Sequence, residues 1–256
     1  TPGYHPLKSE LWIYDLNSKQ LNCLIKGDIA IATPSFSPDG QTIAYLSHDI
    51  KFGEASFYKL WTVNLESGEK TCLTTSVDMA LGNWGLNDVS DLCILSKPIW
   101  DSNGKNLYFT GSDQGNVEIY TVSLDGNLKK IISGHRQIGQ FSLDAAKRNL
   151  VFNFSSPLIP GDISIFDLVE NKENRLTEIN KELLDNRLLS LPEEFCIKGK
   201  NGHDISGWIM KPVSFKESQK YPAILEIHGG PHLMYANSFF FEFQFLASSG
   251  YVVIYS

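Results

Sequence analysis

Residues 228–231, His-Gly-Gly-Pro, are the part of the sequence whose residue types best suit chemistry. They follow an apolar run, Ala223–Ile227, which predicts a buried strand that ends in an exposed loop. Gly229 and Gly230 have no Cβ, so their backbone can approach a bound molecule closely and adopt φ values that other residues avoid. Pro231 has no N–H and fixes the direction in which the chain leaves the loop. In open α/β sheets, ligands bind at the carboxyl ends of strands, where this loop is expected.

A glycine loop of this kind can offer backbone N–H donors to a developing negative charge. In acyl transfer, the tetrahedral intermediate carries an oxyanion that needs preorganised donors at about 2.7–3.1 Å. The alternative is a strand-terminating turn that binds nothing, and the motif by itself leaves both interpretations open. His228 is expected to be a structural histidine that hydrogen-bonds to the backbone rather than a catalytic base.

The segments around the loop predict how it is held. Leu246–Gly250 resembles the end of a helix with a glycine terminator, and Tyr251–Tyr255 is a second apolar strand, which together complete a βαβ unit. Upstream, predicted strands at Glu194–Lys198 and Ile205–Met210 flank a hairpin turn at Asn201-Gly202. Two antiparallel strands that lead into a buried strand with a glycine loop are typical of the start of an α/β-hydrolase sheet. In that fold the loop contributes an N–H to the oxyanion hole.

The sequence lacks the remaining parts of an acyl-transfer site. No G-x-S-x-G nucleophile motif occurs, because Ser164 has the wrong spacing from Gly161 and Ser248 lies at a helix end. The triad of serine, acid and histidine is therefore expected beyond Ser256, and none of the six histidines is predicted to be its base. Metal-binding motifs are absent too, so no cofactor and no metal are predicted. This stretch alone is predicted to be catalytically inactive.

Three segments upstream share one strand pattern. Alternating apolar and polar residues followed by a polar turn predict half-buried strands at Glu10–Leu16, Lys59–Leu65 and Val117–Leu124. Trp12 and Trp61 lie as far apart as Cys23 and Cys72, which indicates a repeat with a fixed register. Two independent strand pairs would not keep the same internal offset.

A second pattern, an aromatic residue followed by a tight turn and an alternating strand, predicts hairpins at Pro34–Tyr45, Pro98–Phe109 and Gln140–Phe152. The third copy has Ala145-Ala146 in place of a glycine turn, which predicts a longer turn there. One hairpin plus one strand pair gives four strands per unit, which is typical of a β-propeller blade.

The predicted fold class is therefore mainly β followed by α/β. Residues 1–190 are expected to form the C-terminal part of a β-propeller, with about three to four blades present and further blades upstream of Thr1. Residues 191–256 are expected to form the N-terminal part of an α/β-hydrolase catalytic domain that stops before the nucleophile.

Two connections depart from the repeat. The long loop Ser76–Ser96 carries Trp84, Asn87, Asp88 and Asp91, and it is either a simple spacer or an insertion with a function. Asn180–Leu191 is compatible with a helix that ends before Pro192, which marks a probable linker between the two domains.

Composition limits the classes of partner. The chain has 20% charged and 42% apolar residues and a net charge of −7, with Lys and Arg scattered, which argues against a nucleic-acid or anionic-membrane surface. No apolar run is long enough to span a bilayer, and the start at Thr1 indicates that the chain begins within a longer protein. The four cysteines, Cys23, Cys72, Cys93 and Cys196, are predicted to be buried reduced thiols of a cytoplasmic protein, with a disulfide or metal framework as the alternative.

The whole chain resembles the prolyl oligopeptidase family of serine peptidases, and within it the bacterial acylaminoacyl-peptidases. The resemblance depends on ordered motifs that span nearly all of the sequence: Phe36–Gly40 with Leu60-Trp61, Pro192–Phe195, Gly202 with Gly207-Trp208 and Lys211-Pro212, Tyr221-Pro222 before His228–Pro231, and Gly250–Val253.

The resemblance implies a seven-bladed propeller that caps an α/β-hydrolase domain, with a Ser-Asp-His triad that cleaves short peptides or acylated N-terminal residues. It also implies that Gly230 offers its backbone N–H to the oxyanion, with His228, Gly229 and Pro231 completing the substrate loop. Expected partners are short peptides, with self-association into a homo-oligomer left open. An esterase of the same fold and a non-catalytic propeller binding module are the alternatives.

Overall fold

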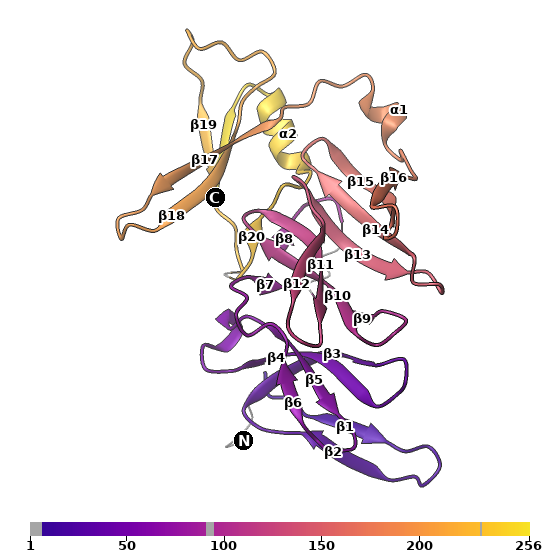
Figure 1. Ribbon diagram of the computed structural model, residues 1–256. Helices are drawn as coiled ribbons and strands as arrows, with labels where there is room; N and C mark the ends of the chain where they lie inside the picture. Colours follow the sequence, from indigo (N-terminus) through magenta and orange to yellow (C-terminus); the bar gives the residue numbers. More distant parts are fainter. Residues whose placement is uncertain (1–6, 91–94, 231) are drawn as a thin grey trace. The chain divides into compact units, whose positions relative to one another are not determined.

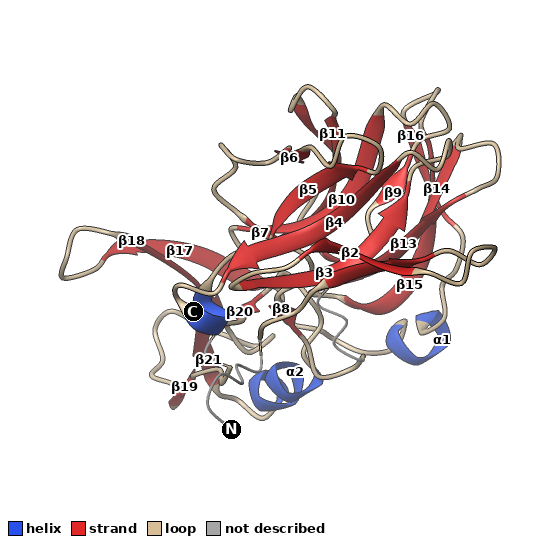
Figure 2. Ribbon diagram, turned by 90° about the horizontal axis from the view of Figure 1, so that it is seen from below, coloured by secondary structure: helices blue, strands red, loops and turns tan. Residues whose placement is uncertain are grey.

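The computed structural model describes residues 7–90, 95–230 and 232–256 of the chain. Strands dominate these residues, whose helices are one 3₁₀ turn, η1 (Gly53–Ala55), and two short α-helices, α1 (Lys181–Leu184) and α2 (Phe241–Ser248) (Figure 1; Figure 2). The mainly β architecture predicted from the sequence is confirmed. Two compact units can be separated: unit 1 contains Thr1–Gly82, Ile94–Gly111 and Ile119–Ile132, and unit 2 contains Asn83–Cys93, Ser112–Glu118 and Ser133–Ser256.

Unit 1 is built from antiparallel strand pairs. Strands β3 to β6 form a four-stranded sheet in chain order, while β1 pairs with β2, β9 with β10, and β11 with β12. The strands that lie in or enter this unit are β1 (Leu11–Tyr14), β2 (Leu21–Ile25), β3 (Ile29–Phe36), β4 (Thr42–Asp49), β5 (Lys59–Asn64), β6 (Lys70–Cys72), β7 (Ala80–Leu81), β9 (Ile99–Trp100), β10 (Asn106–Asp113), β11 (Asn116–Ser123) and β12 (Leu128–Ile132).

The repeat predicted from equal spacing is present in the strand register. Trp12 of β1 lies opposite Cys23 of β2, and Trp61 of β5 lies opposite Cys72 of β6. The two cysteines are half-buried free thiols and Cys196 is an exposed one, so the expectation of buried thiols is wrong for Cys196. Cys93 lies outside the described residues.

The three predicted hairpin turns have the same length. In Ser37–Thr42, Asp101–Asn106 and Asp144–Asn149, the N–H of the first residue donates to the carbonyl of the sixth at 2.8–3.0 Å. The fourth residue has a positive φ in each turn: +71° at Gly40, +66° at Gly104 and +54° at Lys147. The longer turn expected at Ala145-Ala146 is wrong, because Lys147 adopts the left-handed conformation that glycine provides elsewhere. The Asp144 carboxylate supports this turn by accepting two backbone N–H groups at 2.8 and 3.1 Å.

The core of unit 1 comes from the alternation of side chains along these strands. Strand β4 is buried on both faces, because apolar surface removed from water is the main stabilising term. One face packs in a cluster of Leu11, Ile25, Ile43, Tyr45 and Val63, and the other faces the larger core. The larger core consists of Ala44, Leu46, Leu60, Leu73, Met79, Leu81, Trp100, Leu107, Phe109, Tyr120 and Val122.

Unit 2 contains two separate sheets. The first is antiparallel and follows chain order, with β13 (Gln137–Leu143), β14 (Asn149–Ser156), β15 (Ile159–Asp167) and β16 (Lys172–Arg175). The second is mixed, in the order β17-β18-β21-β19, with β17 (Pro192–Lys198), β18 (Asp204–Met210), β19 (Ala223–Glu226) and β21 (Val252–Tyr255). A short bridge between β8 (Gly85–Leu86) and β20 (Met234–Tyr235) is also present.

The predicted βαβ unit is confirmed. Strand β19 runs parallel to β21, and α2 connects them and ends before Gly250, whose φ is +91°. Strand β19 is nevertheless exposed, contrary to the expectation of a buried strand: Leu225 is 63% exposed and Ile227, just beyond it, is 80% exposed. It lies at the edge of the described sheet, where β21 is its sole strand partner among the described residues, so much of its apolar surface remains uncovered.

The helix expected over Asn180–Leu191 is limited to the four residues of α1. Leu183 and Leu188 are 62% and 80% exposed, so the apolar side chains of this segment do not bury the surface that stabilises short helices. None of the helices in the described part of the chain is both long and apolar enough to cross a bilayer.

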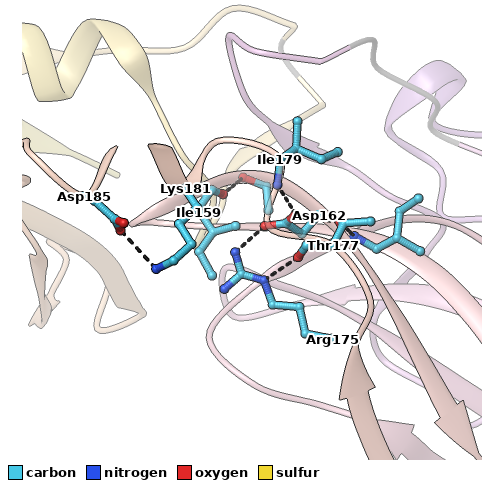
Figure 3. Close-up of polar contacts among 9 residues, drawn as sticks. Ile159, Asp162, Arg175, Thr177, Ile179, Lys181 and Asp185 are labelled. Atoms are coloured by element: carbon cyan, nitrogen blue, oxygen red, sulfur yellow. Dashed lines mark hydrogen bonds and ion pairs between the residues drawn. The ribbon is translucent and has the colours of Figure 1, made fainter. Parts of the chain in front are cut away.

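Asp162 of β15 holds the segment that leads from β16 to α1 (Figure 3). Its buried carboxylate accepts hydrogen bonds from the Thr177 hydroxyl at 2.6 Å, from the Ile179 N–H at 3.0 Å and from the Arg175 guanidinium. Burial alone would raise the pKa of Asp162, but the three donors outweigh it and lower the pKa below its ordinary value of 3.8.

The stabilisation from Asp162 should depend on pH. A carboxyl whose folded pKa is lowered stabilises the fold above its unfolded pKa, and this contribution is lost as the pH falls through the folded value. We expect Asp162→Asn to lower the free energy of unfolding at pH 7 by about 2 kcal/mol, since it removes charge-assisted hydrogen bonds. Urea denaturation should show the difference from the unsubstituted protein shrinking below a pH of about 4.

The matched control is Asp185→Asn, which breaks an exposed pair with Lys181 at 3.2 Å. Exposed pairs of this type contribute about 0.3–0.5 kcal/mol, so little change is expected. Equal effects of the two substitutions at pH 7 would contradict the assigned role of Asp162.

Candidate functional site

Contacts of His228 hold the loop that follows β19. His228 Nδ1 donates to the Gly229 carbonyl oxygen at 2.8 Å, and its ring packs edge-on against Tyr235 with ring centroids 5.2 Å apart. These contacts are those of a structural histidine. Gly229 and Gly230 are exposed, while Pro231 lies outside the described residues.

Of the two glycines, only Gly230 has a backbone conformation that requires glycine. Its φ is +138°, and a Cβ would lie 3.0 Å from the His232 nitrogen and 3.3 Å from Leu233 Cγ. A Cβ on Gly229 would meet no atom within 4 Å. A side chain is therefore sterically compatible with position 229, whereas at position 230 it would force the backbone to rearrange.

The chain after the loop is anchored by an aromatic cluster. The Tyr235 ring contacts Phe240, Phe243 and Tyr255 with centroid separations of 5.3–5.5 Å. Burial is the main cause that raises the pKa of both tyrosines, Tyr235 and Tyr255, and nearby carboxylates add to it. Both phenols therefore stay protonated at neutral pH, and the cluster serves packing rather than proton transfer.

A distant segment, Trp84–Asp88, forms a splint along the residues that follow the loop. β8 and β20 pair in parallel, with Gly85 opposite Met234 and Leu86 opposite Tyr235 (Figure 1). The Trp84 ring stacks on His232 with centroids 4.6 Å apart, and Met234 N donates to the Trp84 carbonyl at 3.0 Å. We call Trp84–Asp88 the splint below.

The far end of the splint caps helix α2. No side-chain cap comes from Phe240, the residue at the N-cap position. Both oxygens of Asp88 fill this role, since Phe241 N and Glu242 N each donate to the carboxylate at 2.8 Å. A carboxylate at this position satisfies N–H groups that have no partner within the helix and also opposes the positive end of its dipole.

Contacts of Gly85 and of Gln137 hold the splint in place. A Cβ on Gly85 would lie 2.8 Å from Ala236 Cβ, so only glycine permits this approach. Gln137 of β13 donates to Asn83 Oδ1 at 2.9 Å and accepts from Asn87 Nδ2 at 3.1 Å. The loop Ser76–Ser96, for which the sequence allowed a spacer or a function, thus holds the glycine-loop segment through its described residues.

A second support comes from the turn between β10 and β11. Asn237 N donates to the Gly115 carbonyl at 2.7 Å, and its side-chain nitrogen donates to Asn116 Oδ1 at 2.9 Å. Gly115, with φ +77°, lies against the ring of the buried Trp208. These contacts connect the turn to both the mixed sheet and the chain that enters α2.

A cavity of about 480 Å³ also lies in unit 2. Its lining includes the amides of Asn83, Gln137, Gln140 and Asn153, together with Asp162. Because the Asp162 carboxylate is already hydrogen-bonded to Arg175, the cavity presents neutral amide groups rather than a free charge. It offers no pairing of nucleophile and base.

The predicted site residues His228, Gly229 and Gly230 therefore form one exposed loop, whose chemistry is limited to backbone donors. The described residues contain no group of three or more His, Cys, Asp or Glu side chains that could hold a metal ion. The supporting residues Trp84, Asp88 and Gly115 were not predicted as parts of the site. The unusual length of the loop Ser76–Ser96 was the one sequence feature that pointed to Trp84 and Asp88.

Curated proteins with sequences similar to this chain are named as peptidases. The chain is 33% identical over 205 residues to the uncharacterized peptidase YuxL of Bacillus subtilis, a match that covers 80% of this chain and 31% of that protein. It is 26% identical over 254 residues to dipeptidyl-peptidase 5 of Porphyromonas gingivalis, covering 96% of this chain and 34% of that protein. The chain thus spans about a third of the length of these curated relatives. No family model matches the chain.

Solved structures share the fold. Acylaminoacyl peptidase from Pyrococcus horikoshii superposes with a TM-score of 0.77 at 23% identity, over 98% of this chain and 36% of that chain. A structure of prolyl endopeptidases superposes with a TM-score of 0.66 at 12% identity, over 97% of this chain and 34% of that one. The fold is therefore that of part of a peptidase of this kind. The chain is a homologue of the prolyl oligopeptidase family of peptidases, which confirms the resemblance drawn from its motifs.

The close approach of Gly115 to Trp208 can be tested by substitution. In Gly115→Ala the Cβ would lie 2.4 and 2.5 Å from two ring carbons of Trp208, and the backbone would keep an unfavourable positive φ. We expect the free energy of unfolding to fall by about 2–4 kcal/mol, from left-handed strain plus overpacking. Thermal or urea denaturation measures this loss.

Gly68→Ala is the control, since Gly68 also has a positive φ, +72°, but a Cβ there would meet no atom within 4 Å. It should carry the backbone strain of about 1–2 kcal/mol alone. If Gly115→Ala were no more destabilising than Gly68→Ala, the contact with Trp208 would have no energetic importance.

Proposed function

We propose that this chain is part of a serine peptidase that hydrolyses short peptides or acylated N-terminal residues through an acyl-enzyme. The observation that carries the proposal is the glycine loop at the end of β19, in a parallel βαβ unit, with Gly230 in a conformation that favours glycine. Homology to peptidases supports it. Activity would require residues beyond this sequence, which has no nucleophile motif.

The same proposal assigns the two parts of the chain. Residues 1–190 would be the C-terminal part of a β-propeller, supported by the four-stranded antiparallel sheet β3–β6, by the four consecutive antiparallel strands β13–β16 and by three hairpin turns with one geometry. Residues 191–256 would be the start of an α/β-hydrolase domain, supported by the antiparallel pair β17-β18 beside the parallel pair β21-β19. The propeller would restrict the active site to small substrates.

In this proposal, Gly230 contributes through its backbone N–H. Attack of a serine hydroxyl on a peptide carbonyl leaves negative charge on the carbonyl oxygen, which Gly230 N–H would stabilise together with the amide that follows the serine. The serine would lose its proton to a histidine oriented by an acid, as in other enzymes with this triad. His228 is engaged with its own backbone and is assigned no proton transfer.

A fluorophosphonate probe tests the class of reaction, because it reacts with activated serine nucleophiles. We expect covalent labelling of the longer protein that contains this sequence, and none of residues 1–256 alone, as read by intact-mass spectrometry. Labelling of the 256-residue chain would reveal a nucleophile within it. An unlabelled and inactive longer protein would favour the non-catalytic binding module, and preferential turnover of ester substrates would favour the esterase.

Substitution of the glycines tests the role of the loop. Gly230→Ala keeps the backbone N–H, but its Cβ would force the backbone to rearrange and so move the donor. We expect kcat of the longer protein to fall by about 10²-fold, the loss from a misplacement of about 1 Å. Gly229→Ala is the matched control and should stay within a few-fold of the unsubstituted enzyme, because its Cβ meets no atom within 4 Å. A folded Gly230→Ala enzyme with unchanged kcat would contradict the claim that the glycine conformation places this donor, and loss of activity in Gly229→Ala as well would contradict the distinction between the two positions.

A further inference from the structure

We infer that the splint, Trp84–Asp88, positions the Gly230 amide for oxyanion binding, with Trp84 and Asp88 as its positioning residues. The inference depends on the proposed function, because it assigns these residues to the same site. It means that the glycine motif alone would not place the Gly230 N–H, because a second segment of the chain is also needed. The donor would be held in place by a segment more than a hundred residues earlier in the chain.

The contact nearest to the donor is made by Trp84. His232, whose ring stacks on Trp84 at an interplanar angle of 21°, is only two residues from Gly230. Met234 N donates to the Trp84 carbonyl, which fixes the backbone two residues further along. Gly230 therefore lies between a strand end, β19, and a segment whose position the splint determines.

Contacts at the middle of the splint fix the register between β8 and β20. Leu86 accepts a hydrogen bond through its carbonyl from Ser238 Oγ at 2.8 Å, in addition to the β8–β20 pairing. The close approach of Gly85 to Ala236 fixes the separation of the two backbones. A shift of either strand would break these contacts together.

Asp88 fixes the far end. Because it binds the N–H groups of Phe241 and Glu242, it sets where α2 begins and so limits the length of chain available between Gly230 and the helix. With Trp84 at one end and Asp88 at the other, residues 232–242 are restrained at both ends. Gly230 lies next to the restrained end of this segment, since a Cβ built on it would be only 3.0 Å from the His232 nitrogen.

An oxyanion donor acts in the transition state, so misplacement should lower kcat and leave substrate binding unchanged. In the longer protein, Trp84→Ala and Asp88→Ala are expected to reduce kcat by about 10-fold to 10²-fold, the range for a displacement of about 1 Å. KM should stay within about twofold of the unsubstituted value, in line with a loss confined to the transition state.

Two matched variants distinguish positioning from general damage. Trp84→Phe keeps an aromatic ring against His232 and should recover most of the lost kcat. Glu242→Ala removes an acidic side chain from the first turn of the same helix but leaves the Asp88 carboxylate on its N–H groups, so kcat should be unchanged. Circular dichroism must show the same fold for all four variants.

Hydrogen exchange gives a readout that does not require activity. Peptides that cover residues 228–240 should exchange faster in Trp84→Ala and Asp88→Ala, while peptides from β13 to β16 keep their rates. If the unsubstituted longer protein is inactive, the proposed function fails whatever the exchange shows. If it is active, and if both variants keep the original kcat or leave exchange over residues 228–240 unchanged, the inference about the splint is overturned and the proposed function stands.

Discussion

Two backbone N–H groups at the start of helix α2 find their acceptors in a residue that is remote in sequence. Phe240 offers no side-chain cap, and the carboxylate of Asp88 accepts from Phe241 and Glu242 instead. This contact fixes where the helix of the βαβ unit begins. Because α2 lies between β19 and β21, the cap also constrains the length and path of the chain that carries the glycine loop. In the proposed assignment, the position of the Gly230 N–H depends on this constraint.

The loop illustrates how a rigid scaffold can hold a flexible backbone in one conformation. Gly230 has a φ of +138°, and glycine on its own would interconvert with other conformations. Around it lie a strand end, an aromatic cluster centred on Tyr235 and the paired backbones of β8 and β20. Each holds a different part of the segment 228–242. Preorganised donors are effective because they require no rearrangement when charge develops, and the proposed role of Gly230 depends on this property.

Patterns that act over short distances were predicted well from the sequence. The hairpin turns at Gly40 and Gly104, the paired register of Trp12 and Trp61, and the parallel strands around α2 all follow from alternation, turn residues and spacing. Lys147 shows a limit of this approach, because a non-glycine residue takes the left-handed position and the turn keeps its length. The prediction of a longer turn assumed that glycine is required there.

Features that depend on distant partners could not be predicted in the same way. Leu225 and Ile227 form an apolar run that suggests burial, yet exposure depends on which elements cover the strand, and apolar composition does not determine that. Leu183 and Leu188 match a helix pattern, but short helices need a packing surface that these residues do not find. The contacts of Trp84 and Asp88 join residues that no local pattern relates, so only the folded chain revealed them as supports of the site.

The central claim is that Gly230 N–H is a donor to the oxyanion. A crystal structure of the longer protein, with a phosphonate bound covalently at its serine, tests this directly because the phosphonyl oxygen occupies the place of the oxyanion. The account predicts that Gly230 N lies about 2.7–3.1 Å from that oxygen. A phosphonyl oxygen hydrogen-bonded to other groups, with the Gly230 N–H pointing away from it, would contradict the account.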